Sequence, residues 1–183
     1  MNRIIVGFLT VFRMLFPRSM KGNIKHWRKK GISIGKNCYI FSELPVGRDC
    51  FLLSIGDRVL ISNHVTFLQH DASMCVATHS EFTDVLGKTT IGDDCFIGFG
   101  SIIMPGVSLA NGTIVGAGSV VTKSVNKSDM IIAGNPARII CSKEDFLKKN
   151  LKYAVNLDGM NQSDIAKYLQ ENPDKIIHRA SLD

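Results

Sequence analysis

The chain has 183 residues, of which 45% are hydrophobic, and its formal net charge is +6. This length suits one domain with additional end segments and excludes two large domains. The five cysteines contain no Cys-x-x-Cys pair and no zinc-finger spacing, so we expect no disulfide framework and a reducing, cytoplasmic location.

Residues 1–30 form the first predicted segment, and they carry the basic charge of the chain. They hold eight Lys and Arg and no acidic residue, whereas the rest of the chain sums to −2. The apolar run from Ile4 to Phe12 is too short for a membrane span, which needs about 20 residues, and no small-residue cleavage site follows it. Two interpretations stay open. The segment is a helix lying in the inner membrane surface, or a helix that covers one end of the main domain with its charges in solvent.

Residues 31–141 are predicted to form the main domain, because they repeat with a period of six. Repeats begin at Ile34, and three extra residues, Leu52–Ser54, interrupt them once. From Ile91 to Asn126 six unbroken hexads each open with a branched aliphatic residue and carry a small or β-branched residue at the fifth position. Strand side chains alternate, so an even period returns the same side of the chain to the interior, whereas a helix needs a spacing of three or four. The pattern predicts an all-β solenoid, a parallel β-helix with three hexads in each triangular coil.

A loop at about residues 71–84 interrupts these repeats. The period is lost after Asp71 and resumes at Val85 or Ile91. Long loops within a regular fold are often functional, and this one begins beside His70. We therefore expect a functional site at the mouth of the loop.

Residues 142–183 are predicted to form a C-terminal helical cap and tail. Ser142 to Asp145 resemble a capping box ahead of one helix. A second helix is predicted over Ser163–Gln170, before Asn172 and Pro173. Because the open end of a solenoid must be covered, these helices are its natural cover.

Several motifs of the chain together resemble the left-handed β-helix, hexapeptide-repeat acetyltransferases. They are Ile61-Ser-Asn-His-Val-Thr-Phe-Leu-Gln-His70-Asp, Gly87-Lys-Thr-Thr-Ile-Gly-Asp-Asp-Cys-Phe-Ile-Gly, Met104-Pro-Gly-Val, Val115-Gly-Ala-Gly-Ser-Val-Val-Thr-Lys123 and Ala133-Gly-Asn-Pro-Ala-Arg138. The chain most resembles the maltose and galactoside O-acetyltransferase group, which includes capsule and O-antigen enzymes. Over about residues 31–141 the resemblance implies left-handed coils, acetyl-CoA as acyl donor and a homotrimer with sites in the clefts between protomers.

The resemblance places the family's histidine base at His70. A neutral imidazole can take the proton of a hydroxyl as it attacks a thioester. Asp71, the next residue, is a candidate to orient the ring, and a backbone carbonyl is the alternative. His64 is expected to be a surface turn residue and His79 structural or incidental. Stacked histidine ligands would need a spacing near eighteen, which these three lack, so no metal site is expected.

Cofactor and acceptor contacts are also implied by the resemblance. The segment Gly116–Ser119 has almost no side chain, so a thin pantetheine arm can lie along the backbone there. Acetyl-CoA contacts are implied for Ala117, Thr122 and Lys123, with Arg138 near the phosphates. Phe99 stands where relatives often have a small polar residue beside the thiol arm. Ser42 stands where similar sugar acetyltransferases have an acceptor-binding Asn.

The predicted function is an acetyl-CoA-dependent O-acetyltransferase that transfers the acetyl group directly to a hydroxyl of a bacterial surface polysaccharide, such as capsule or O-antigen, or its precursor. The basic N-terminus favours a membrane-adjacent or polyanionic acceptor. Two alternatives stay open: an enzyme of the same scaffold that acetylates serine, a free sugar or an antibiotic, and a non-enzymatic scaffold. No nucleic-acid partner is expected, because no aromatic stacking platform accompanies the basic segment.

Overall fold

The computed structural model describes residues 20–179 and 181, so the apolar run from Ile4 to Phe12 lies outside the described residues. The chain divides after Cys141 into two compact units. Within the described residues, no helix is both long and apolar enough to cross a membrane.

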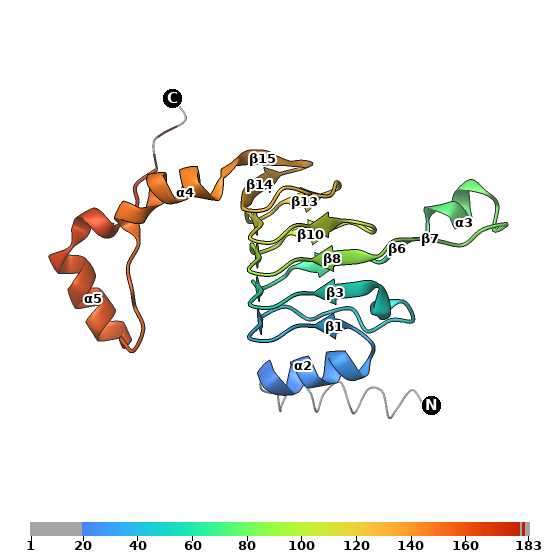
Figure 1. Ribbon diagram of the computed structural model, residues 1–183, viewed down its shortest axis with the longest axis horizontal. Helices are drawn as coiled ribbons and strands as arrows, with labels where there is room; N and C mark the ends of the chain where they lie inside the picture. Colours follow the sequence, from blue (N-terminus) through green and yellow to red (C-terminus); the bar gives the residue numbers. More distant parts are fainter. Residues whose placement is uncertain (1–19, 180, 182–183) are drawn as a thin grey trace. The chain divides into compact units, whose positions relative to one another are not determined.

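In the described part of the first unit, short strands stack into three ladders whose members follow one another in turn along the chain (Figure 1). The first ladder contains β1 (Ser33–Ile34), β3 (Leu53–Ile55), β8 (Thr89–Ile91) and β11 (Ser108–Leu109). The second contains β2 (Tyr39–Ile40), β4 (Leu60–Ile61), β9 (Phe96–Ile97), β12 (Ile114–Val115), β14 (Met130–Gly134) and β15 (Ala137–Ser142). The third contains β5 (Thr66–Phe67), β10 (Ile102–Ile103) and β13 (Val120–Val121). The chain therefore winds as a parallel β-helix, as the hexads predict.

The pairing register shows how many residues each coil uses. Ile97 pairs with Val115, eighteen residues later, which is three hexads. Ile34 pairs with Ile55, twenty-one residues later, because the coil between them holds the three extra residues. Ile55 pairs with Ile91, thirty-six residues later, because the chain leaves the stack and returns to it one coil further along. Both interruptions leave the stacking of the coils intact.

The core is formed by side chains at the first position of the hexads, each no more than 7% exposed. They are Ile34, Ile40, Ile55, Ile61, Phe67, Ile91, Ile97, Ile103, Leu109, Val115 and Val121. Small residues at the fifth position, including Cys38, Cys50 and Cys95, are also buried. Burial raises the pKa of the Cys95 thiol to about 11, which keeps this thiol protonated and unreactive near neutral pH.

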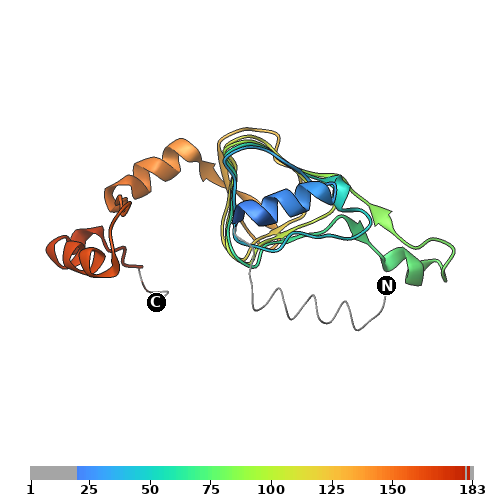
Figure 2. The ribbon, with the colours of Figure 1, turned by 90° about the horizontal axis from the view of Figure 1, so that it is seen from below.

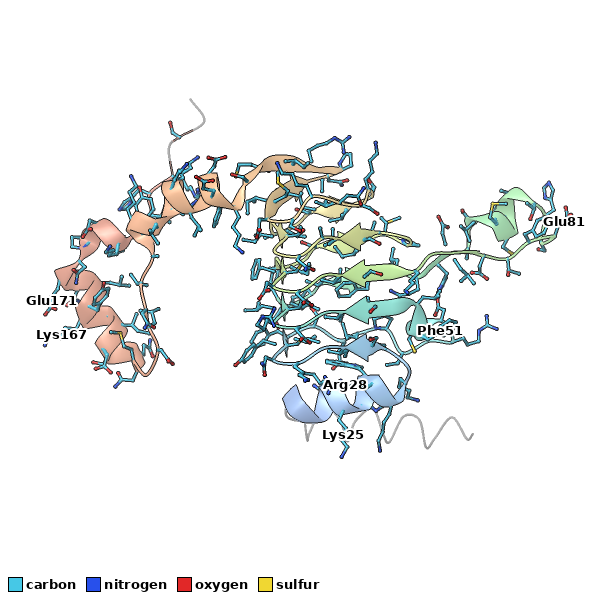
Figure 3. The ribbon with its side chains drawn as sticks, in the orientation of Figure 1. Lys25, Arg28, Phe51, Glu81, Lys167 and Glu171 are labelled. Atoms are coloured by element: carbon cyan, nitrogen blue, oxygen red, sulfur yellow. The ribbon has the colours of Figure 1, made fainter. Side chains whose placement is uncertain are left out.

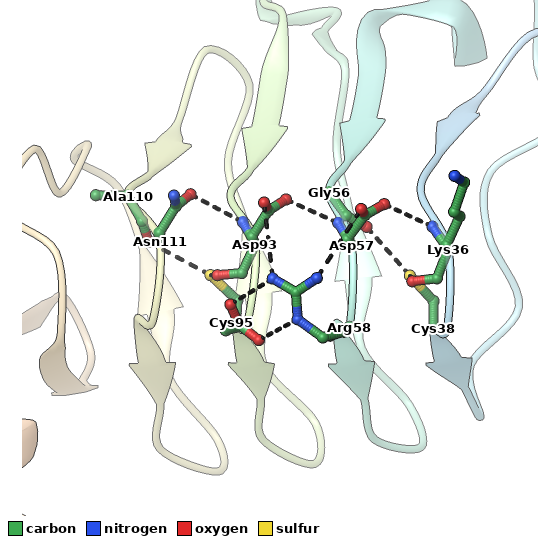
Figure 4. Close-up of polar contacts among 10 residues, drawn as sticks. Lys36, Cys38, Gly56, Asp57, Arg58, Asp93, Cys95, Ala110 and Asn111 are labelled. Carbon is green, nitrogen blue, oxygen red and sulfur yellow. Dashed lines mark hydrogen bonds and ion pairs between the residues drawn. The ribbon is translucent and has the colours of Figure 1, made fainter.

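A column of polar side chains ties successive coils together along the edge that follows the first ladder (Figure 4). The Asp57 carboxylate accepts a hydrogen bond from the Lys36 backbone N–H at 2.7 Å, and Asp93 accepts one from the Asp57 N–H at 2.8 Å. Asn111 does the same for the Asp93 N–H at 2.9 Å. Each corner N–H thus finds an acceptor one coil away, which satisfies backbone donors that the ladders leave unpaired.

The helix α2 (Met20–Lys29) lies across the first coil (Figure 2). Its Trp27 is 1% exposed and belongs to the core. Arg28 donates from Nε to the Ile34 carbonyl at 2.9 Å, while Lys25 and Lys29 are exposed. The described part of the N-terminal segment therefore covers the coil end and keeps its charges in solvent.

An arm, residues 70–86, projects from the stack between β5 and β8 (Figure 1). It begins with β6 (His70–Asp71), which pairs antiparallel with β7 (Val85–Leu86), and it contains the short helix α3 (Ser73–Ala77). The loop expected at about residues 71–84 lies within this arm. His70 is the first residue of the arm, at the edge that follows the third ladder.

The second unit contains α4 (Lys143–Asn150), η2 (Leu151–Tyr153), α5 (Gln162–Glu171) and η3 (Pro173–Lys175). The Ser142 hydroxyl caps α4 by accepting from the Asp145 N–H at 3.1 Å. The helix α5 extends one residue further at each end than the sequence predicts, with Asn161 and Asp164 forming a capping box. That this unit covers the open end of the coils stays a prediction.

Candidate active site

His70 forms a close pair with an aspartate from the coil below. Its Nδ1 lies 2.5 Å from Oδ2 of Asp49. The His70 side chain is 53% exposed, whereas the Asp49 side chain is 16% exposed. A carboxylate at Nδ1 holds the proton on that nitrogen and leaves Nε2 as the acceptor. Within residues 20–179 and 181, Nε2 has no hydrogen-bond partner, so the ring is anchored on one side and open on the other.

Asp49 reaches this position through the irregular first coil. It is the N-cap residue of η1 (Cys50–Leu52), a short 3₁₀ turn that precedes β3. Cys50, which is 3% exposed, anchors the turn through an Sγ hydrogen bond to the Lys30 carbonyl at 2.9 Å. Asp49 stands twenty-one residues before His70, the length of the coil that holds the extra residues. Counting the coil in this way would have identified Asp49 from the sequence.

Asp71 does not contact the His70 ring in the way that its place in the chain suggested. Its Oδ1 accepts a hydrogen bond at 2.8 Å from the N–H of Ser73, the first residue of α3. This bond lowers the pKa of the Asp71 carboxyl. The reason is geometric, because successive side chains of a strand point to opposite sides. The group that orients His70 is Asp49, and Asp71 shapes the arm.

Asp49 also sets the charge state of the site. Its hydrogen bond, and then its charge, raise the pKa of His70 above the ordinary value. The charge of Asp84 acts in the same direction, while partial desolvation and Arg48 lower the pKa. The same hydrogen bond lowers the pKa of the Asp49 carboxyl. His70 is therefore a stronger base than a free histidine.

A groove of about 620 Å³ lies against this pair. It is lined by Gly47, Arg48, Asp49, Phe51, His70, Thr83, Asp84 and Leu86. These residues come from two parts of the chain, the turn around η1 and the arm. The first part comes directly before the three extra residues, and the second is the arm that interrupts the repeats, so the groove lies where the hexad period is broken. Its volume is in the range of sites for small ligands.

Two of the predicted cofactor residues lie on the same edge as His70. Val121 pairs with Ile103, and Ile103 pairs with Phe67, so Thr122 and Lys123 stand two coils from Leu68 and Gln69. Two strand spacings are about 10 Å. Lys123 and Arg138 also line one pocket of about 400 Å³. The structure therefore brings together two cations that suit the phosphates of a nucleotide.

Ala117 and Phe99 lie on a different edge, the one that follows the second ladder. They occupy corresponding corners of adjacent coils, and the Gly118 N–H donates to the Phe99 carbonyl at 2.8 Å. Both residues are exposed. A Cβ atom at position 98 would lie 2.6 Å from the Ala117 nitrogen, so the two coils approach too closely at this corner for a residue other than Gly98. Within one chain, the predicted contacts of the cofactor are thus divided between two edges.

Ser42 is buried at the start of the same edge, with 6% of its surface exposed. Its hydroxyl donates to the Ser62 carbonyl at 2.6 Å and accepts from the Val65 N–H at 2.7 Å. The hydroxyl is therefore engaged in closing a coil corner.

His64 has a φ of +60° at a turn, and its ring meets that of Phe99 edge-on at 5.1 Å between centroids.

Comparison with known proteins relates this geometry to a family. Residues 88–123 match the model described as bacterial transferase hexapeptide (six repeats). Protein CapG of Staphylococcus aureus is 37% identical over 163 residues, which cover 86% of this chain and 94% of that protein. Galactoside O-acetyltransferase of Escherichia coli K12 is 34% identical over 111 residues, 60% of this chain and 53% of that enzyme.

A solved structure has the same coil architecture. It is a hexapeptide-repeat acetyltransferase of Vibrio cholerae O1 biovar eltor in complex with acetyl coenzyme A, at 30% identity and a TM-score of 0.53, over 62% of this chain and 61% of that one. This likeness implies the left-handed sense of the coils that was expected. From the repeats, the fold and the nearly full-length match to CapG, we conclude that the chain belongs to the hexapeptide-repeat acyltransferase family.

Proposed function

We propose that the protein is an O-acetyltransferase in which His70 removes the proton from an acceptor hydroxyl. Acetyl-CoA is the acyl donor. The observation that carries the proposal is the His70–Asp49 pair on the wall of a groove, in which Asp49 holds Nδ1 and leaves Nε2 as the acceptor. A sugar hydroxyl is a poor nucleophile, so a base at this place is what its acetylation requires.

In the proposed mechanism, Nε2 of neutral His70 takes the hydroxyl proton while the acceptor oxygen bonds to the thioester carbonyl carbon. Asp49 stabilises the imidazolium that forms. As the carbon–sulfur bond breaks, His70 returns the proton to the departing thiolate. No acyl-enzyme is formed. Base catalysis supplies about 10²–10⁴-fold, and the remainder comes from holding the two substrates together.

The donor site is proposed on the residues that resemblance selected. Lys123 and Arg138, which share a pocket, bind the phosphates. Thr122 and the narrow corner at Ala117 contact the rest of the cofactor. Phe99, with 53% of its surface exposed, is a bulky neighbour of that corner and limits the path of the thiol arm.

A homotrimer is the proposed assembly, because the residues proposed to bind the cofactor lie on two edges of a single chain. The outer face of the second ladder is apolar, with Tyr39, Leu60, Phe96 and Ile114 in register, and Tyr39 is 56% exposed. Packing between copies would bury this column and set one edge beside another. Light scattering should report three copies for the wild type and fewer for Phe96→Glu, which puts a charge in the contact. A wild-type monomer with full activity would contradict the assembly.

The proposed acceptor is a hydroxyl of a bacterial surface glycan or its precursor. A galactoside O-acetyltransferase is among the similar proteins, and the basic helix α2 suits an anionic polymer or membrane. Arg28 and Lys36 line a pocket of about 470 Å³ beside it. The double variant Lys25→Glu with Lys29→Glu should lose binding to vesicles that contain anionic lipid. It should keep thiol release with small sugars, and unchanged vesicle binding would contradict the proposed role of α2.

The decisive test is release of coenzyme A thiol with purified surface polysaccharides and small sugars as acceptors. His70→Ala should lower kcat by about 10²–10⁴-fold with the affinity for acetyl-CoA kept. His79→Ala, a control on the exposed arm, should behave as the wild type. If His70→Ala turns over as fast as the wild type, His70 is not the base.

A further inference from the structure

The turn η1 that carries Asp49 also presents an aromatic ring to the same groove. Phe51 follows Asp49 by two residues and lines the groove together with His70. Phe51 is 62% exposed. Figure 3 shows Phe51 on the side of the coil stack from which the arm projects. One irregular turn therefore holds the base from one side and supplies an apolar surface beside it.

The exposure of Phe51 comes from the way in which the turn is built. Cys50 and Leu53, on either side of it, are 3% and 0% exposed, and the Leu52 N–H donates to the Asp49 carbonyl at 2.9 Å. Burying a Phe side chain stabilises a fold, and Phe51 in η1 stays mostly exposed. The backbone of Phe51 is thus fixed, and its ring is directed outward on a rigid base.

The charges around the groove indicate what kind of ligand this ring meets. The groove is lined by one cation, Arg48, and two carboxylates, Asp49 and Asp84, so with neutral His70 its formal charge is −1. Like charge disfavours an anionic group on the sugar residue that enters the groove, whereas charges elsewhere on a polymer lie outside it. A flat apolar surface with a few polar groups at its rim suits a neutral ring that has C–H bonds on one face and hydroxyls at its edge.

We propose that Phe51 is a specificity-determining residue, the platform on which the apolar face of a neutral pyranose ring stacks so that one rim hydroxyl points to His70. This assignment rests on the proposed O-acetyltransferase function and narrows its acceptor class. The ring provides a preorganised surface of the kind that binding sites use. Glycan acceptors would then be selected by the shape of the sugar ring, and linear polyols with the same hydroxyls would bind poorly.

The test compares KM and kcat for cyclic and open-chain acceptors. The probes are methyl β-D-galactopyranoside, methyl β-D-glucopyranoside and the alditols galactitol and glucitol, with thiol release as the signal. Phe51→Ala should raise KM for the pyranosides about five- to tenfold with little change in kcat. Phe51→Tyr should keep the KM for the pyranosides close to the wild-type value. Phe51→Leu, whose side chain is apolar but not flat, should raise this KM as Phe51→Ala does. The KM values for the alditols should not change.

Phe82→Ala is the matched control, because Phe82 is 57% exposed on the arm and does not line the groove. Thermal unfolding and light scattering of each variant show whether fold or assembly has changed. Equal KM in wild type and Phe51→Ala overturns the platform and leaves the acetyltransferase intact. A rise in KM that accompanies loss of assembly overturns it too. If the wild type releases thiol with none of the sugars, the glycan acceptor itself is wrong.

Discussion

The regular coils from Ile91 to Asn126 differ in role from the segments at the two interruptions, residues 47–54 and 70–86. In the regular coils, the position of a residue in its hexad decides whether it is buried, and corner residues such as Asp93 bond to the next coil. Beside the two interruptions of the period, Leu52–Ser54 and the arm, Asp49, Phe51 and His70 meet at a groove. The repeat provides a rigid frame, and the departures from it place the chemistry.

The largest effect on stability is expected from truncating a core side chain of the regular coils. Ile97 is 0% exposed and lies between Ile61 and Val115 of the adjacent coils. Ile97→Ala should lower the free energy of unfolding by about 2–5 kcal/mol. Val76→Ala, at an arm residue that is 81% exposed, should change it by less than about 0.5 kcal/mol. Denaturant unfolding measures the free energy of both variants. Similar losses in Ile97→Ala and Val76→Ala would contradict the view that the regular coils carry the stability and the arm does not.

A smaller effect is expected at the polar edge. Asp93→Ala removes the acceptor for the Asp57 N–H and should cost about 0.5–1.5 kcal/mol. Asp93→Asn should cost much less, because Asn111 already makes the equivalent bond with an amide oxygen. Thermal unfolding of the two variants measures the difference. Equal losses of stability in both variants would mean that the ion pair of Asp93 with Arg58 contributes more than the hydrogen bond to the Asp57 N–H. In that ion pair, Oδ2 of Asp93 lies 3.9 Å from Nη2 of Arg58.

The stack of regular coils was predictable from the sequence, because each hexad by itself determines which of its side chains face the core and the same pattern then repeats. The hexads predict which side chains point inward, and the three extra residues at Leu52–Ser54 appear as a shift of register. The arm, with His70 at its start, was predictable for the same reason, since a break in a regular period is visible. The role of His70 as the base came from the resemblance and stays a proposal.

The pairing of His70 with Asp49 was not predicted, because it depends on which coil lies beneath the arm. Asp71 is nearer in the chain, but its carboxylate is engaged with the Ser73 N–H. Ser42 was expected at an acceptor site from resemblance alone, and burial places its hydroxyl in a coil corner. In both cases the outcome depends on which residues the stacked coils place beside the side chain.

The smallest effect is expected at Asp71. Asp71→Asn keeps an oxygen that can accept from the Ser73 N–H, so thiol release should stay within about twofold of the wild type. A loss comparable to that of His70→Ala would mean that Asp71, not Asp49, supports the base.

The pH dependence of kcat/KM for wild type and Asp49→Asn tests the central claim most directly. General base catalysis needs neutral His70, so the wild-type rate should rise with pH through a midpoint above the ordinary histidine pKa of about 6.5. Asp49→Asn weakens the hydrogen bond and removes the charge that together raise the pKa of His70, so its midpoint should move to lower pH and its plateau should fall. An unchanged midpoint and plateau in Asp49→Asn would contradict the pairing of His70 with Asp49 as the catalytic base.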